Sequence, residues 1–463
     1  MNRIATVRGL PLWDGCDVQM GEGVEVEPDW GMAACLVHGG PCLVFRHLIS
    51  THPPIIDLPM THAPTPTMIH PPKVDSLDSL LPSEPLLMMG AGPVPIPYRV
   101  AQANSIVINH LGETMARVID QLKAMARYVF QTESPWILGV AGPGSAAMEM
   151  SVCNLVHPGT RVLCVCNGYF GRRFADMAQR VGGEVEVLTI ADGEAATLEE
   201  VRDQLERFRP EVLTIAQGET SSTVFNRYLP EIAQLARSHG CYVIVDAVCT
   251  LSTMPLKMDA WHIDAVITGG QKGLSSIPGV SLIAFSNRAW ERIVARPHAP
   301  PQWCLDARLA EQFWHKASYH YTAPVSGILA LHEALHLVCT ETLPERFARH
   351  LRCSIGLQRG IEAMGLRLYS TQASRLNSVV GIEVPSGIDR VEVCRRISDR
   401  YRVEISGSFG LNIVRIGQMG EQCRAHNLFR TLHAFGSTMK ELGAQVDVAA
   451  GVAELERQLQ GAL

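Results

Sequence analysis

The stretch that says most about this chain is Thr268-Gly-Gly-Gln-Lys-Gly-Leu-Ser-Ser276, a glycine-flanked turn that carries Lys272. One structural unit earlier, the apolar run Tyr242-Val-Ile-Val ends in the carboxylate of Asp246. A lysine amine can form a Schiff base with an aldehyde, and a carboxylate can keep a pyridine nitrogen protonated so that the ring accepts electrons. Pyridoxal phosphate (PLP) needs both groups. A loop lysine alone is usually a solvated charge, so the prediction depends on the pair.

Apolar strands alternate with helical patterns on both sides of this stretch. Most of the predicted strands are continuous apolar runs, which indicates a parallel sheet covered on both faces. The strands are expected at Ile137–Ala141, Arg161–Cys166, Glu184–Thr189, Glu211–Ala216, Tyr242–Ala247, Ala265–Thr268 and Ser281–Phe285. The helices between them are expected at Ala146–Val156, Arg172–Val181, Leu198–Phe208 and Glu231–His239. Seven such strands predict one large α/β domain with a doubly wound, mostly parallel sheet.

Three regions are expected along the chain. Residues 1–72 are rich in proline and histidine, as in His52-Pro-Pro, and predict a poorly ordered extension because proline interrupts helices and central strands. Residues 73–340 should form the large domain with an N-terminal arm. Residues 341–463 should form a smaller α+β domain, with strands near Ser378–Val384, Tyr401–Ile405 and Leu411–Ile416.

The composition is that of an ordinary globular enzyme. Of the 463 residues, 47% are hydrophobic and 19% are charged, and the net charge of −6 gives no reason to bind nucleic acid or an anionic membrane. No apolar run reaches the roughly 18 residues of a membrane span. The 13 cysteines form no CxxC pair and often lie in apolar runs, so we expect reduced thiols in a cytoplasmic protein.

A glycine-rich turn, Ala141-Gly-Pro-Gly-Ser145, joins the first predicted strand to a helix. Backbone N–H groups at a helix start, with the hydroxyl of Ser145 beside them, suit a phosphate group. The alternative is a tight turn with no ligand. No Gly-Lys-Ser/Thr follows, which excludes an ATP-binding P-loop.

Further polar and aromatic residues follow other predicted strands. Phe170 follows the second strand and Ser221 the fourth, and Thr250 comes shortly after Asp246. The carboxyl ends of parallel strands share one edge of a sheet, where ligands bind in this architecture. Phe170 can stack on a planar cofactor or only pack on the surface, and Asp246 can be a helix N-cap. Five loops meeting at one edge, with Lys272 among them, favour a shared site over packing.

Arg415 lies in the apolar strand pattern Leu411-Asn-Ile-Val-Arg-Ile-Gly417. A charge in such a strand needs a compensating anion. That anion is either a fixed carboxylate of the protein or the carboxylate of a substrate held by two hydrogen bonds. Considered in isolation, the pattern favours the structural ion pair.

A metal motif also occurs, in His332-Glu-Ala-Leu-His336, which fits the HExxH pattern of zinc proteases. The extended form of that motif fails, because Cys339 stands where it has glycine, and no third ligand is evident. We therefore expect an ordinary helix and no metal.

The chain resembles the class V, fold-type I PLP aminotransferases, and most of all the alanine–glyoxylate (serine–pyruvate) aminotransferases. The resemblance runs from about Pro71 to near the C-terminus. Leu86-Leu-Met-Met-Gly-Ala-Gly-Pro93 looks like the glycine–proline motif near the start of that family, and Phe130-Gln-Thr132 matches it too. The family places cofactor contacts, the Schiff-base lysine and the pyridine partner at positions matching Gly144, Ser145, Phe170, Ser221, Asp246, Gln271 and Lys272. Thr250, at the same sheet edge, is expected to contact the cofactor as well.

The resemblance also implies a substrate site and a shared subunit arrangement. Arg415 matches the arginine that binds the substrate carboxylate, so the resemblance favours a substrate anion over the structural ion pair, and Gly92 and Ser221 are expected beside the substrate. The segment Tyr319-His-Tyr-Thr322 resembles one that reaches the cofactor phosphate of a second subunit, so Tyr319 and Thr322 predict a homodimer with shared active sites.

The implied activity is transfer of an amino group from alanine or serine to glyoxylate or pyruvate, through a Schiff base on Lys272. Phe170, where the family often has tryptophan, and Ser145, where histidine is frequent, are departures that weaken the substrate assignment. Ureidoglycine–glyoxylate and pyridoxamine–pyruvate aminotransferases therefore remain alternatives. A desulfurase lacks the expected cysteine loop. A catalytically silent relative would be expected to have lost Lys272, Asp246 or Arg415.

Overall fold

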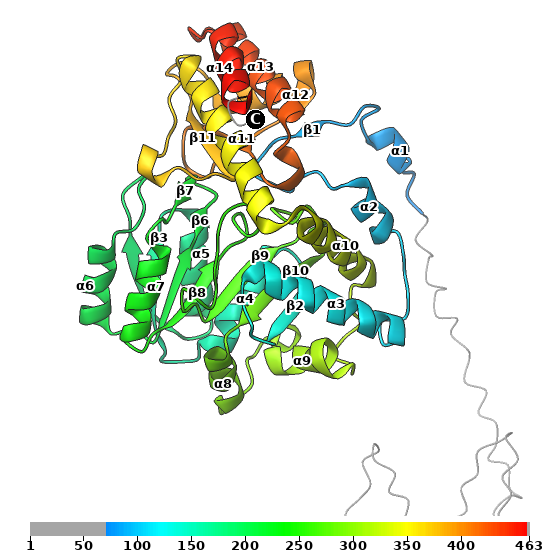
Figure 1. Ribbon diagram of the computed structural model, residues 1–463, viewed down its shortest axis with the longest axis vertical. Helices are drawn as coiled ribbons and strands as arrows, with labels where there is room; N and C mark the ends of the chain where they lie inside the picture. The colour runs from blue at the N-terminus through cyan, green and yellow to red at the C-terminus, as the bar shows by residue number, and fades with distance from the viewer. Residues whose placement is uncertain (1–70, 461–463) are drawn as a thin grey trace, which may run out of the picture. The chain divides into compact units, whose positions relative to one another are not determined.

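The computed structural model describes residues 71–460 (Figure 1). The predicted extension, residues 1–72, lies almost entirely outside the described residues. From Leu77 onward the chain forms one unit. Within the described range, no helix is both long enough and apolar enough to cross a membrane.

A seven-stranded sheet forms the centre of this unit, with strand order β2-β10-β9-β8-β5-β3-β4. Six strands run parallel, and β10 is antiparallel to both of its neighbours. The strands are β2 Ile137–Ala141, β3 Arg161–Cys166, β4 Glu184–Thr189, β5 Val212–Ala216, β8 Tyr242–Asp246, β9 Ala265–Gly269 and β10 Val280–Phe285. The prediction of an α/β fold with a mostly parallel sheet is confirmed, and each predicted strand lies within one residue of its observed bounds.

Helices pack on this sheet, as the continuous apolar strands require (Figure 1). A single hydrophobic core joins sheet and helices, and it includes Phe174, Leu205 and Ile232, which are fully buried. The helices of this part are α2 Tyr98–Asn104, α3 Glu113–Phe130, α4 Gly144–Leu155, α5 Tyr169–Arg180, α6 Leu198–Phe208, α7 Leu229–Ser238, α8 Asn287–Ala295, α9 Ala307–Lys316 and α10 Val325–Glu341. Shorter elements are α1 Leu77–Leu80, η1 Trp303–Leu305, and the hairpin of β6 Gly218–Glu219 with β7 Val224–Phe225.

A second hydrophobic core lies in the C-terminal part, where a three-stranded sheet of order β11-β14-β13 packs with helices. Its elements are α11 Leu343–Ala363, η2 Gln372–Ser374, β11 Val379–Glu383, α12 Arg390–Tyr401, β12 Val403–Glu404, β13 Ser406–Gly407, β14 Ile413–Gly417, η3 Gly420–Gln422, α13 Ala425–Glu441 and α14 Val448–Gln460. The N-terminal arm joins this part, because β1 Leu87–Met88 pairs with β12 and Met89 is buried in the second core.

One predicted strand of this part, Tyr401–Ile405, is shorter than expected. Tyr401 is the last residue of α12, and only Val403 and Glu404 pair as a strand, with the N-terminal arm. The sequence pattern could not show this, because the partner strand lies more than 300 residues earlier. The division of residues 73–463 into domains at residue 340 stays a prediction.

Candidate active site

Five loops meet at one edge of the large sheet, the edge at which its parallel strands end. They follow β2, β3, β5, β8 and β9, and they carry most of the candidate residues of the sequence. The roles of the individual residues stay predictions, but the structure shows which of them lie together and what each side chain contacts.

Lys272 lies in the turn after β9 and is partly buried. Its Nζ donates a hydrogen bond to the carbonyl oxygen of Ala91 in the N-terminal arm. A Cβ on Gly92, which has φ +99°, would lie 2.5 Å from this Nζ, so only glycine fits here. Burial lowers the pKa of Lys272 to about 8, although Cys249 and Asp246 nearby act to raise it. The lysine amine is therefore easier to deprotonate than an exposed one.

Asp246 ends β8 and is nearly inaccessible to solvent. Its Oδ1 accepts a hydrogen bond of 2.7 Å from the backbone N–H of Val248. Burial raises the pKa of Asp246 to about 7, against the effect of this hydrogen bond. A buried carboxylate with one backbone partner is suited to a cationic group such as a protonated pyridine nitrogen.

This buried carboxylate leads to a stability prediction for the protein prepared without cofactor. The pKa of Asp246 is higher in the folded chain than its ordinary value of 3.8. Its contribution to stability is therefore present at low pH and is lost as the pH rises through about 7. We expect Asp246→Asn to increase the free energy of unfolding more at pH 8 than at pH 5. Urea unfolding of wild type and variant at pH 5 and pH 8 measures this difference. An equal change in the free energy of unfolding at the two pH values would contradict the prediction.

The start of α4 offers a place for a phosphate group. Gly144 is the first residue of that helix, where backbone N–H groups are free to bind an anion. A Cβ on Gly269 would lie 2.6 Å from Oε1 of Gln271 and 3.2 Å from the backbone nitrogen of Gly144, so these groups lie close together. Oε1 of Gln271 and Oγ1 of Thr250 are buried with no hydrogen-bond partner among the described residues. Such orphaned groups fit a site that binds a polar ligand.

Ser145 and Phe170 are linked through Arg173, a residue that the sequence did not single out. A guanidinium nitrogen of Arg173 donates to Oγ of Ser145 at 2.5 Å. The same guanidinium lies 4.7 Å from the centre of the Phe170 ring, within the range of a cation–π contact. Arg173 therefore joins the expected phosphate seat to the aromatic ring expected over the cofactor.

The hydroxyl of Ser221 is occupied by protein contacts. It donates to Glu219 at 2.5 Å and accepts from the backbone N–H of Tyr169 at 2.8 Å. Glu219 is fully buried and also accepts from the N–H groups of Phe170 and Gly171, so it caps the start of α5. The predicted contact of Ser221 with cofactor and substrate has to compete with these bonds.

Arg415 lies in the middle of β14 and is only 6% exposed. Its guanidinium donates to the carbonyl oxygen of Thr220 at 2.8 Å and to that of Gly407 at 2.9 and 2.6 Å. No carboxylate lies within ion-pair distance of it in the described part of the chain. Burial lowers the pKa of Arg415 to about 10, against the effect of the nearby Glu219. The structural ion pair considered from the sequence is therefore not formed.

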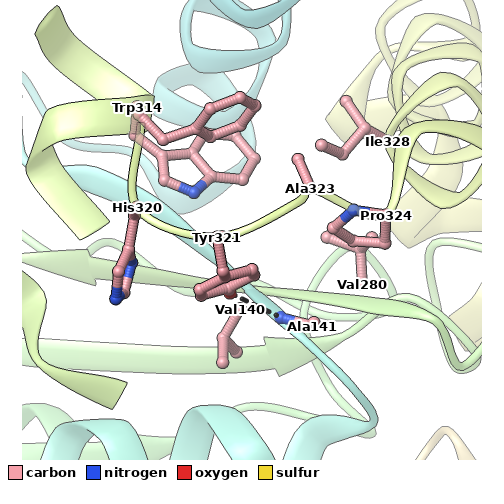
Figure 2. Close-up of a pocket in the computed structure, with 11 residues that line it drawn as sticks. Val140, Ala141, Val280, Trp314, His320, Tyr321, Ala323, Pro324 and Ile328 are labelled. Atoms are coloured by element: carbon pink, nitrogen blue, oxygen red, sulfur yellow. Dashed lines mark hydrogen bonds between the residues drawn. The ribbon is translucent and has the colours of Figure 1, made fainter. Parts of the chain in front are cut away.

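The segment that carries Tyr319 and Thr322 lies at the edge strand β2, and both residues are exposed. Between them, Tyr321 accepts a hydrogen bond of 3.5 Å from the N–H of Ala141, at the start of the glycine-rich turn (Figure 2). Figure 2 shows Tyr321 beside Trp314 in the apolar cavity that this segment borders. Neither Tyr319 nor Thr322 contacts the Lys272 site of its own chain within the described residues.

The HExxH residues are engaged with neighbouring helices. Nε2 of His332 lies 3.0 Å from Oε1 of Gln121, and Glu333 forms an ion pair of 2.7 Å with Arg99. Among the described residues, no three side chains of the metal-binding types come together. The motif falls on α10, in agreement with the expected helix.

Arg346 of α11, which the sequence also did not single out, joins the two loops that carry Asp246 and Lys272. It is 3% exposed and donates to the carbonyl oxygen of Gly273 at 2.5 Å and to Oγ of Ser252 at 3.3 Å. It also pairs with Glu341 at 2.6 Å. A guanidinium with these partners holds the loops after β8 and β9 together.

We expect Arg346→Met to destabilise the protein by about 3–5 kcal/mol, because it removes one partner from a buried ion pair. Arg359→Met on the same helix is the matched control, since its ion pair with Glu362 is half exposed and should be worth at most about 1 kcal/mol. Urea unfolding of both variants measures the difference. Equally small losses of stability in the two variants would show that Arg346 does not hold the loops after β8 and β9 together.

A partly buried lysine, a buried carboxylate and a helix start able to bind an anion lie on one edge of a doubly wound sheet, an arrangement that suits a PLP enzyme. The family model "Aminotransferase class-V" matches residues 98–425. The chain belongs to the class V aminotransferases. It is a PLP-dependent aminotransferase of fold-type I, as the sequence predicted.

Individual relatives show how far the likeness extends. An alanine–glyoxylate aminotransferase of Drosophila melanogaster is 34% identical over 392 residues, which cover 82% of this chain and 99% of the relative. The crystal structure of an alanine–glyoxylate aminotransferase from Nostoc sp. has a TM-score of 0.76 at 33% identity, covering 79% of this chain and 100% of the other. That of ureidoglycine–glyoxylate aminotransferase from Bacillus subtilis has a TM-score of 0.79 at 28% identity, covering 82% and 99%.

Proposed function

We propose that this protein transfers the amino group of L-alanine or L-serine to glyoxylate or pyruvate. The observation that carries the proposal is Arg415, a buried guanidinium with no ion pair among the described residues, in the same site as Lys272 and Asp246. A small amino acid or 2-oxo acid offers the carboxylate that this guanidinium lacks. The names of the Drosophila and Nostoc relatives support glyoxylate as the acceptor.

Residues of the site fit PLP, which when bound supplies an electron sink beside the bond to be broken. Gly144 at the helix start, Gln271 and Thr250 would hold its phosphate and polar edge, with Phe170 against the ring. Asp246 would keep the ring nitrogen protonated. Lys272 would hold the cofactor covalently before the donor arrives.

During the reaction, Arg415 would fix the donor by its carboxylate and so set the orientation of the Cα–H bond. The released amine of Lys272 would then accept the Cα proton. With a pKa of about 8, about half of the amine is in its neutral form at pH 8, and this is the form that acts as a general base.

The assembly and the location of the protein belong to the same proposal. Tyr319 and Thr322 are exposed on their own chain, which supports a homodimer in which they complete the site of the second subunit. The cysteines Cys153, Cys164, Cys166 and Cys241 are buried and free, in keeping with a reducing cytoplasm.

A second candidate is transfer from ureidoglycine to glyoxylate, which the Bacillus subtilis neighbour favours by its name. Pyridoxamine is a third donor to test. The purified protein, loaded with PLP, is assayed with L-alanine, L-serine, ureidoglycine and pyridoxamine, each with glyoxylate and with pyruvate. We expect kcat/KM to be highest for alanine or serine. Higher values for ureidoglycine or pyridoxamine would overturn the donor assignment, and no turnover with any donor would overturn the activity.

A further inference from the structure

Two aromatic rings from distant parts of the sequence stack beside the site. Tyr169 is the first residue of α5, and Phe409 lies in the turn between β13 and β14. Their ring centres are 4.4 Å apart and their planes differ by 22°. Both are unusually open to solvent for large aromatic side chains, at 46% and 55% exposed. Both rings of the stack are therefore in contact with solvent at this edge of the site.

Each ring is also connected to a group with an expected role in binding. The centre of the Phe409 ring is 5.9 Å from Cζ of Arg415, and Gly407, two residues earlier, accepts hydrogen bonds from the same guanidinium. The Tyr169 ring meets Phe170 edge to face at 5.6 Å. The stack therefore lies between Arg415, which is expected to bind the carboxylate, and Phe170, which is expected to lie over the cofactor.

The turn that carries Phe409 is fixed to the site at a further point, because the hydroxyl of Ser408 donates to the carbonyl oxygen of Ser221. Arg415 is almost inaccessible, and protein carbonyls already take up part of its guanidinium. A carboxylate bound there would lie near the Phe409 ring, which is 5.9 Å from Cζ of Arg415 and carries Tyr169 stacked on it. A large substituent on the Cα next to that carboxylate would have to displace the rings.

We propose that the Tyr169–Phe409 stack determines specificity, admitting donors with small side chains and excluding branched or aromatic ones. This rests on the proposed function, since it assumes that Arg415 binds the carboxylate of a 2-amino acid. The stack is not itself catalytic. Removal of one ring opens space of several methylene groups, and a single methylene in an apolar pocket changes selectivity by roughly 10–200-fold.

The first test compares kcat/KM for L-leucine and L-alanine in wild type, Phe409→Ala and Tyr169→Ala. We expect Phe409→Ala to raise the leucine-to-alanine ratio by at least about tenfold, with Tyr169→Ala in the same direction. Phe409→Tyr keeps a ring in the stack and is the matched control, with an unchanged ratio. An unchanged ratio in both alanine variants, or an equal loss for both donors, would overturn the proposal.

The second test does not depend on turnover. Propionate and 4-methylpentanoate carry the same carboxylate but no amino group, and calorimetry measures their dissociation constants on the PLP-loaded protein. Phe409→Ala should strengthen binding of 4-methylpentanoate relative to propionate. If no donor reacts but this shift appears, the role of the stack is supported and the proposed donor class fails. If the relative affinity does not change, the role of the stack is wrong whatever the donors do.

Discussion

Replacement of Lys272 by alanine should lower the transamination rate by at least about 10³-fold, the upper part of the range for a positioned proton-transfer group. The site places this one lysine in the turn after β9, against Ala91 and Gly92, where its pKa is lowered to about 8. The rate of the first half-reaction, followed by the visible absorption of the bound cofactor, measures the effect.

Lys257→Ala is the matched control for this variant, because Lys257 is an exposed lysine in the loop between β8 and β9. Surface substitutions usually have small effects, so the rate of this control should stay within about twofold of wild type. Added methylamine can test whether the missing group is an amine, since partial recovery is expected only for Lys272→Ala. A Lys272→Ala rate within about tenfold of wild type would contradict the assignment of Lys272, because a positioned proton-transfer group contributes more than that.

Replacement of Arg415 by methionine is expected to lower kcat/KM for L-alanine by about 10²–10⁴-fold, because two hydrogen bonds to a charged group are lost, at roughly 1.5–3 kcal/mol each. Arg415→Lys keeps the charge but not the planar pair of donors, so an intermediate loss is expected. The dissociation constant of propionate, which reports carboxylate binding alone, should rise in the same order.

The same substitution removes donors to the carbonyl oxygens of Thr220 and Gly407, so stability must be measured beside activity. Thermal unfolding of both variants shows whether the fold persists at the assay temperature. A folded Arg415→Met variant that binds propionate as wild type does would show that the carboxylate is held elsewhere.

The order of apolar runs was enough to predict the large domain. Its strands are buried on both faces, and local hydrophobicity marks them almost to the residue, as for β3 Arg161–Cys166. Strand β12 was predicted poorly because its partner is the N-terminal arm, and no local pattern encodes a pairing between Leu87 and Val403. The sequence likewise placed Asp246 and Lys272 on one sheet edge, because strand ends determine that position.

Contacts between distant segments could not be predicted in this way. Arg346 lies in a helix that follows Lys272 by more than 70 residues, and only the fold brings it to Gly273. Glu219 stands two residues before Ser221 among polar neighbours, so the local sequence did not mark it as a buried cap of α5. Phe409 gave no signal, since an aromatic residue in a turn is ordinary until Tyr169 is found stacked on it.

The most direct test of the role of Lys272 is to locate the covalent attachment of PLP on the chain. The PLP-loaded protein is reduced with borohydride, digested and analysed by peptide mass spectrometry, with Lys272→Ala treated in parallel. We predict a pyridoxyl group on the peptide that contains Lys272 and none on the variant. Attachment at another lysine, or equal labelling of wild type and variant, would contradict the assignment on which the proposed function depends.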